Sequence, residues 1–237
     1  MAQKIKVSTK KSWNRPDELI TTTSVVFEYL LENKKKITLC AAGLFFAALL
    51  FSGWKFYSNR AESKASHFYY QVIRDYHEIN NKKNSEQDDK EAKNLVLSQL
   101  KEITEKYPIT DSATKAFLYS GHLYYDLKEF DRSIQSYQNF LKKTSKDDPL
   151  RILGLDGLAY AYEAKGDYEN ALKFFTKIVD EERNPLSEMS HLNAGRCYEE
   201  LGENGKALET YQHVLAMYPD SSYSALVKER IKILEKQ

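Results

Sequence analysis

Three stretches of the chain repeat one pattern of small and aromatic residues, and this repetition limits the fold more than any other feature. The stretches begin at Phe117, Leu155 and His191, so consecutive starts are 38 and 36 residues apart. Each contains a small residue, a tyrosine three positions on, a turn, a second small residue and an aromatic residue four positions later. A repeat of this length is typical of a solenoid, in which each unit packs only against its neighbours.

The small and aromatic residues of the repeats suggest complementary packing roles. Each repeat has two such pairs, which are Gly121/Tyr124 and Ser133/Tyr137, Ala159/Tyr162 and Ala171/Phe175, and Gly195/Tyr198 and Ala207/Tyr211. We expect the small residues to let two helices approach closely and the rings to fill the space between repeats. Gly166 and Gly202 suit a left-handed turn after a helix, whereas the first repeat has Lys128 in that region.

This pattern resembles the tetratricopeptide repeat (TPR) over about residues 113–219. The resemblance implies an all-α solenoid of helix pairs, in which the first helix of each pair lines a concave face. Upstream, residues 61–79 and 92–107 are expected to form a degenerate repeat, joined by a polar loop over residues 80–90. A capping helix is expected at the C-terminal end, starting at Ser221 or Ser222 and packing through Ala225, Val227, Ile231 and Leu234.

An uncharged run covers residues 37–54. As a helix it would span about 27 Å, close to the hydrocarbon thickness of a bilayer. Trp54 and Tyr57 lie at its end, where aromatic residues meet a membrane interface. The alternatives are a cleaved signal peptide, a lipoprotein signal at Cys40 and a buried soluble helix; the long preceding segment and the all-apolar run disfavour them. We therefore predict one transmembrane helix over residues 37–57, ahead of the solenoid.

Charge bias predicts the orientation of that helix. Residues 1–36 carry eight Lys/Arg and four Asp/Glu, with three lysines directly before the apolar run. The positive-inside rule then places this basic segment in the cytoplasm and residues 58–237 in the periplasm of a two-membrane bacterium, with the anchor in the inner membrane. Residues 17–33 have the spacing of a short amphipathic helix, either lying on the membrane or docking a partner. Because no proline occurs between Pro16 and Pro108, the anchor is expected to continue as a stiff stalk.

The sequence contains no recognisable catalytic, metal-binding or cofactor-binding motif. None of its five histidines belongs to an H-E-x-x-H pattern, and it has neither a C-x-x-C pair nor a glycine-rich phosphate loop. Residues 58–237 carry 26 Lys/Arg and 30 Asp/Glu, a balance that does not suggest nucleic-acid binding. These observations favour a binding module that needs no cofactor over an enzyme.

Helical phase predicts which side chains would meet a bound polypeptide on the first helices of the repeats. They are Leu118, His122 and Tyr125 in the first repeat, Asp156, Tyr160 and Glu163 in the second, and Met189, Arg196 and Glu199 in the third. This mixture of aromatic, apolar and charged groups suits extended or partly unfolded segments. The alternative is an ordinary solvated face.

The order of parts provides a second resemblance. A basic segment ending in FEYLLENKKK, an anchor ending in GWKFY and a TPR array are similar to the YfgM-like family of ancillary subunits of the bacterial SecYEG translocon. That resemblance implies contacts with translocon subunits, periplasmic chaperones or nascent exported chains. Two alternatives remain: a scaffold in an outer-membrane assembly, cell-division or pilus machine, and a eukaryotic organelle receptor, which the charge bias disfavours.

Overall fold

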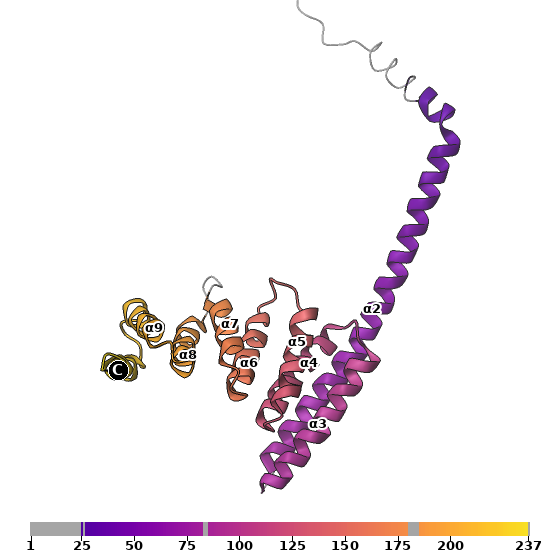
Figure 1. Cartoon of the computed structure of the whole chain (residues 1–237). Helices are drawn as coiled ribbons and strands as arrows, with labels where there is room; N and C mark the ends of the chain where they lie inside the picture. Colours follow the sequence, from indigo (N-terminus) through magenta and orange to yellow (C-terminus); the bar gives the residue numbers. More distant parts are fainter. Residues whose placement is uncertain (1–24, 26, 83–84, 180–184, 237) are drawn as a thin grey trace, which may run out of the picture. The chain divides into compact units, whose positions relative to one another are not determined.

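The computed structural model describes residues 25, 27–82, 85–179 and 185–236, and every regular element within them is an α-helix. The chain divides after Tyr57 into two compact units (Figure 1). Part of the predicted amphipathic helix, residues 17–24 and 26, lies outside the described residues, while residues 27–32 are helical and exposed.

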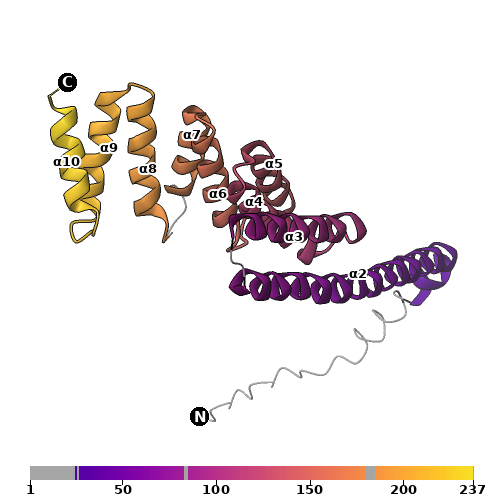
Figure 2. The same ribbon diagram turned by 90° about the horizontal axis from the view of Figure 1, so that it is seen from below.

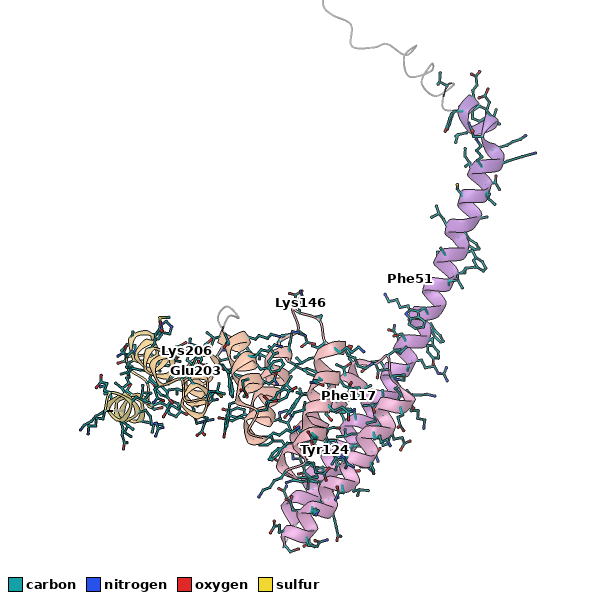
Figure 3. All side chains as sticks on the ribbon, viewed as in Figure 1. Phe51, Phe117, Tyr124, Lys146, Glu203 and Lys206 are labelled. Atoms are coloured by element: carbon teal, nitrogen blue, oxygen red, sulfur yellow. The ribbon has the colours of Figure 1, made fainter. Side chains whose placement is uncertain are left out.

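The first unit contains the apolar run. Helix α2 (Lys34–Lys82) begins just before it, and residues 37–57 are solvent-exposed along their whole length. Figure 3 shows Phe51 projecting from this part of α2, and its side chain is 68% exposed. By length and composition, the segment Lys34–Ile79 could cross a membrane. As expected from the absence of proline, α2 continues without a break through residues 58–82.

In Figure 1, the helices of the second unit follow one another from right to left. The end of α2 and α3 (Glu86–Lys106) form the degenerate repeat. Three helix pairs follow, and a last helix caps them: α4 (Asp111–Asp126) with α5 (Phe130–Lys143), α6 (Arg151–Ala164) with α7 (Tyr168–Val179), α8 (Ser187–Glu200) with α9 (Asn204–Met217), and α10 (Ser224–Leu234). Figure 2 shows α8, α9 and α10 lying side by side. The predicted all-α solenoid is confirmed.

The aromatic residues of the second helices form the centres of the repeats. Tyr137, Phe175 and Tyr211 are all buried, and the small residues four positions before them are completely buried. The Tyr137 ring lies on the backbone of Gly121, where an added Cβ would be 2.6 Å from its Cε1 atom. Gly195 has the same relation to Tyr211, because a Cβ added there would be 2.5 Å from Cε1 of that ring. Close approach therefore requires the small residues, as the repeat pattern predicts.

The turns inside the repeats share one backbone conformation. Gly166 and Gly202 have φ angles of 81° and 73°, and Lys128 has φ 61° in the equivalent turn of the first repeat. The amide of Lys128 donates to the Tyr125 carbonyl at 2.9 Å, and the next amide donates to the Tyr124 carbonyl at 2.8 Å. This pairing satisfies the last carbonyls of the helix. Lysine thus adopts a conformation that favours glycine.

Two predicted boundaries are wrong. The expected polar loop over residues 80–90 is helical in α2 as far as Lys82 and again from Glu86. The side chain of Ser85 accepts a hydrogen bond from the Asp88 amide at 3.1 Å, and acidic residues in the first turn of α3 complement the helix dipole. The capping helix begins at Ser224, because Ser221 accepts from the Tyr223 amide in a preceding turn, and its Ala225 is exposed.

Glu62 joins the end of α2 to the first repeat. Its carboxylate accepts hydrogen bonds from the Asp111 amide and the Ser112 hydroxyl, each at 2.7 Å. These groups lie at the start of α4, where helix amides lack partners within the helix. Ala65 and Val72 of α2 are buried in the same hydrophobic cluster as α3 and α4. The degenerate repeat therefore packs against the first regular repeat, and its Glu62 caps the N-terminus of α4.

Candidate protein-binding face

Helices α4, α6 and α8 contribute the predicted binding residues, and α10 adds to the same series. Two clefts occur among these first helices. We call the one between α4 and α6 the aromatic cleft and the one between α8 and α10 the charged cleft. The face that carries both is the first-helix face.

The aromatic cleft has a volume of about 320 Å³. It brings together four of the nine predicted residues with two that the sequence analysis did not assign to the face. Its lining is His122 and Tyr125 of α4, Tyr137 of α5, and Asp156, Gly157 and Tyr160 of α6. Leu118 is not part of it: this residue is only 8% exposed and packs in the core with Leu158 and Ala161, so its prediction as a surface residue is wrong.

Contacts with neighbouring groups hold the rings of the aromatic cleft in place. The His122 ring donates from Nδ1 to the Leu118 carbonyl at 2.9 Å and meets the Tyr137 ring edge-on, with 5.4 Å between centroids. The Tyr160 ring meets Phe175 edge-on at 5.3 Å. Although His122 reaches solvent, surrounding protein atoms desolvate its imidazole and lower its pKa, so it is neutral at pH 7.

Asp156 provides the carboxylate of the aromatic cleft. Its side chain is partly buried, and this burial raises the pKa of the carboxyl to about 6. Among the residues that the structure describes, no hydrogen bond or ion pair reaches this carboxylate. Asp156 is therefore mostly ionised at pH 7 without an internal counter-ion.

Polar contacts between α6 and α8 separate the two clefts. Glu163 accepts two hydrogen bonds from Arg196, at 2.7 Å from Nε and 2.8 Å from Nη2. Asn193 donates to the Tyr160 hydroxyl at 2.7 Å. The paired guanidinium and carboxylate match in shape and charge, and the pair ties neighbouring repeats together. Both predicted residues are thus engaged with each other on this face.

The charged cleft has a volume of about 360 Å³. It contains the predicted Arg196 and Glu199, and its remaining lining is Leu192, Glu200, Tyr211, Leu226, Val227 and Arg230. Glu199 accepts from the Tyr211 hydroxyl at 2.6 Å and from Arg230 Nε at 3.0 Å, and its second oxygen also contacts Arg230. Met189 is partly buried against the core beneath this region instead of lining the cleft.

Arg230 and Gly157 line the clefts without having been predicted to do so, for different reasons. Arg230 belongs to α10, a capping helix by its sequence, and this helix occupies the place of the first helix of a next repeat. Gly157 falls outside the repeated small positions. A Cβ there would lie 2.3 Å from Tyr137 Cζ, so the glycine makes room for the ring. An extra glycine within a regular helix was the available signal.

Comparison with known proteins agrees with this architecture. The sequence model of the tetratricopeptide repeat-like domain matches residues 28–236. The chain belongs to this family. TPR folds are protein-interaction scaffolds and are generally non-enzymatic.

Two curated relatives contain similar stretches. Lipopolysaccharide assembly protein B of Escherichia coli K12 is 28% identical over 149 residues, which cover 63% of this chain and 34% of that protein. RNA polymerase-associated protein CTR9 of Saccharomyces cerevisiae is 30% identical over 112 residues, covering 42% of this chain and 10% of that protein. The TPR chain thus spans about a third of the first relative and a tenth of the second.

Solved structures share the fold. A tetratricopeptide repeat protein from Parabacteroides merdae has a TM-score of 0.57 at 18% identity, covering 72% of this chain and 61% of that one. MamA has a TM-score of 0.52 at 17% identity, covering 70% of this chain and 82% of its own. At these identities the likeness concerns the arrangement of helices.

Proposed function

We propose that this TPR protein is anchored in a membrane by one helix and binds other polypeptides on its first-helix face. The two clefts on that face carry the proposal, because they place partly exposed aromatic and charged groups along consecutive first helices. Concave sites with convergent polar groups are where ligands bind. The proposed binding residues include His122, Tyr125, Asp156, Tyr160, Glu163, Arg196 and Glu199.

The anchor in this proposal covers residues 37–57. A helix whose apolar side chains are exposed all round is favourable in lipid and unfavourable in water. The lysines before the run support a cytoplasmic N-terminus, with residues 58–237 in the periplasm and the anchor in the inner membrane. In this arrangement, α2 continues from the anchor as a stalk for the repeats.

The partners in this proposal belong to protein export. The layout resembles that of the ancillary translocon subunits, so the candidate partners are translocon subunits, periplasmic chaperones and nascent exported chains. The similarity to lipopolysaccharide assembly protein B supports a role at the bacterial envelope. That similarity also favours a second candidate, a scaffold that holds the components of an envelope machine together.

Photocrosslinking in the native membrane tests the proposal. A photoreactive phenylalanine analogue replaces Tyr160 in the aromatic cleft, and a matched analogue replaces Glu209, which is exposed on α9. Crosslinks from Tyr160 to translocon subunits, periplasmic chaperones or many exported chains would support the export role. One dominant partner from an envelope machine would favour the scaffold. Equal crosslinking from both positions, or none from Tyr160, would contradict binding on the first-helix face.

A further inference from the structure

We propose that the aromatic cleft is a receptor for a basic side chain, lysine or arginine, carried by the bound polypeptide. This inference rests on the proposed function and adds the chemistry of one residue of the partner. Three tyrosine rings, a neutral histidine and one carboxylate line the cleft, and its volume is large enough to admit a long side chain.

The carboxylate supplies the charge complementarity. Asp156 lies at the cleft, partly removed from water, with no hydrogen bond or ion pair from the described residues. A partly buried carboxylate without a partner is unfavourable, so an entering cation gains more here than it would beside a fully solvated one. An anionic side chain would be repelled by the same group. An apolar side chain would displace water without satisfying the carboxylate.

The aromatic rings supply the second part of the receptor. Cations are attracted to the faces of aromatic rings, and the partly exposed rings of Tyr125 and Tyr160 line the cleft from α4 and α6, while Tyr137 of α5 is buried beside them. Edge-on contacts of the His122 and Tyr160 rings with Tyr137 and Phe175 fix their orientation before a ligand arrives. A site arranged in advance loses little conformational freedom on binding. The methylene stem of lysine or arginine would pack along the rings.

The charges around the cleft also favour a cation. On α4, Asp126 adds a second carboxylate near Tyr125 and Tyr137, in addition to neutral His122. On α6, Glu163 lies near Tyr160, and its partner Arg196 comes from α8. Because Glu163 neutralises this guanidinium, the remaining field is negative. Lys93 of α3 reaches Asp126 at 3.5 Å and partly offsets its charge.

The charged cleft contains an internal example of the proposed contact. Tyr211 holds the repeat position of Tyr137, and beside it Glu199 is paired with the guanidinium of Arg230. The protein therefore places its own cation against a carboxylate and a tyrosine in one cleft. The aromatic cleft has a comparable carboxylate and tyrosine without an internal cation among the described residues.

The test measures the affinity of full-length protein in detergent micelles for four short unstructured peptides. They differ only at one central residue, which is lysine, arginine, norleucine or Nε-acetyl-lysine, and binding is followed by fluorescence anisotropy. We expect the lysine and arginine peptides to bind at least tenfold more tightly than the two neutral ones. Asp156→Asn, which keeps the shape of the side chain, should remove this preference. Glu209→Gln, at an exposed carboxylate on α9, should preserve it.

Two results would overturn the receptor. One is equal binding of all four peptides, or no binding of any. The other is an undiminished preference for lysine in Asp156→Asn. In a further variant, Tyr125→Leu should weaken only the basic peptides, several-fold, with circular dichroism confirming the fold. Photocrosslinking from Tyr160 tests the proposed function separately. If Tyr160 crosslinks to partners but all four peptides bind equally, the basic-residue receptor is rejected and the polypeptide-binding role remains.

Discussion

Tyr137 in the aromatic cleft and Tyr211 in the charged cleft occupy the same position of the first and third repeats. Each ring covers a glycine of its first helix. Their surroundings differ, because the Tyr211 hydroxyl donates to Glu199, which is also bound by Arg230. Near Tyr137, Asp156 has no such partner among the described residues. The same tyrosine position therefore lies beside an ion-paired carboxylate in the charged cleft and near an unpaired carboxylate in the aromatic cleft.

The helix that follows each repeat explains the difference. After the third repeat, α10 brings Arg230 to the carboxylate of α8. After the first repeat, α6 contributes Asp156 and Gly157, which supply a charge and space but no cation. The repeat packing thus determines where the rings lie. A few side chains on the following first helix determine whether the protein supplies its own cation to the carboxylate of the cleft.

The largest effect is expected from filling the space beside Tyr137. Gly157→Val should destabilise the repeats by about 3 kcal/mol, because even a Cβ would lie 2.3 Å from Cζ of the ring. The ring also lies close to Gly121, where an added Cβ would be 2.6 Å from Cε1, so it has little room to move away. Chemical denaturation followed by circular dichroism measures the loss. Gly205→Val is the control: nothing lies within 4 Å of an added Cβ there, so its stability should change little. Similar losses in both variants would disprove the packing argument.

Neutralising the carboxylate of the charged cleft should also destabilise the protein. Glu199→Gln leaves Arg230 without its counter-ion and weakens the bond from the Tyr211 hydroxyl. The Glu199 side chain is only 11% exposed, so the expected loss of unfolding free energy is about 2 kcal/mol. Thermal unfolding measures it. A change below about 0.5 kcal/mol, the usual size for an exposed pair, would mean that this ion pair is solvated rather than structural.

The sequence predicted the buried positions that recur in every repeat. Tyr137, Phe175 and Tyr211 are buried as expected, because a ring between repeats needs a small residue opposite it. The first-helix phase also brought His122, Tyr125, Asp156 and Tyr160 into one cleft. Leu118 lies one helical turn before His122, yet Leu158 and Ala161 of the next repeat cover it. Phase along one helix therefore cannot reveal what a neighbouring helix covers.

Local sequence patterns could not predict the hydrogen bonds and ion pairs between residues far apart in the chain. Glu62 reaches the start of α4 across 49 residues of chain, and Arg230 reaches Glu199 across 31. Such pairs depend on how repeats stack, whereas local periodicity reports only which residues share a helix face. Ser85 is different, because a serine followed by acidic residues is a local signal for a helix start, and the helix begins directly after it.

Neutralising the carboxylate of the aromatic cleft should have the opposite effect from Glu199→Gln. Asp156→Asn removes a charge that is partly buried without an internal partner, so it should stabilise the free protein at pH 7. The folded pKa is about 6 and the ordinary value is 3.8. The folded state therefore binds a proton more tightly than the unfolded state, so stability falls as the pH rises from about 4 to about 6, and the full penalty remains above that range. After allowance for partial exposure, the expected gain is about 1 kcal/mol.

The pH dependence of this gain identifies its cause. The difference between variant and wild type should be full above pH 7, shrink as the pH falls through 6, and vanish near pH 4. Taking this difference separates Asp156 from His122, which both proteins contain. Urea denaturation at each pH measures it. A destabilised variant at pH 7 would indicate that Asp156 has a structural role like that of Glu199, and the contrast between the clefts would fail.

The smallest effect is expected in the turns that follow the two first helices. Lys128 after α4 has φ 61°, while Gly202 after α8 has φ 73°. A left-handed conformation costs a non-glycine residue about 1 kcal/mol, but glycine also gains freedom in the unfolded chain. Lys128→Gly should therefore stabilise the protein by only about 0.5 kcal/mol, whereas Gly202→Lys should cost about 1 kcal/mol. Denaturation midpoints measure both. If Lys128→Gly were destabilising instead, the exposed lysine side chain would make a favourable contribution larger than the cost of its left-handed backbone. The turn of the first repeat would then be stabilised by a side chain, whereas the turns of the second and third repeats use glycine.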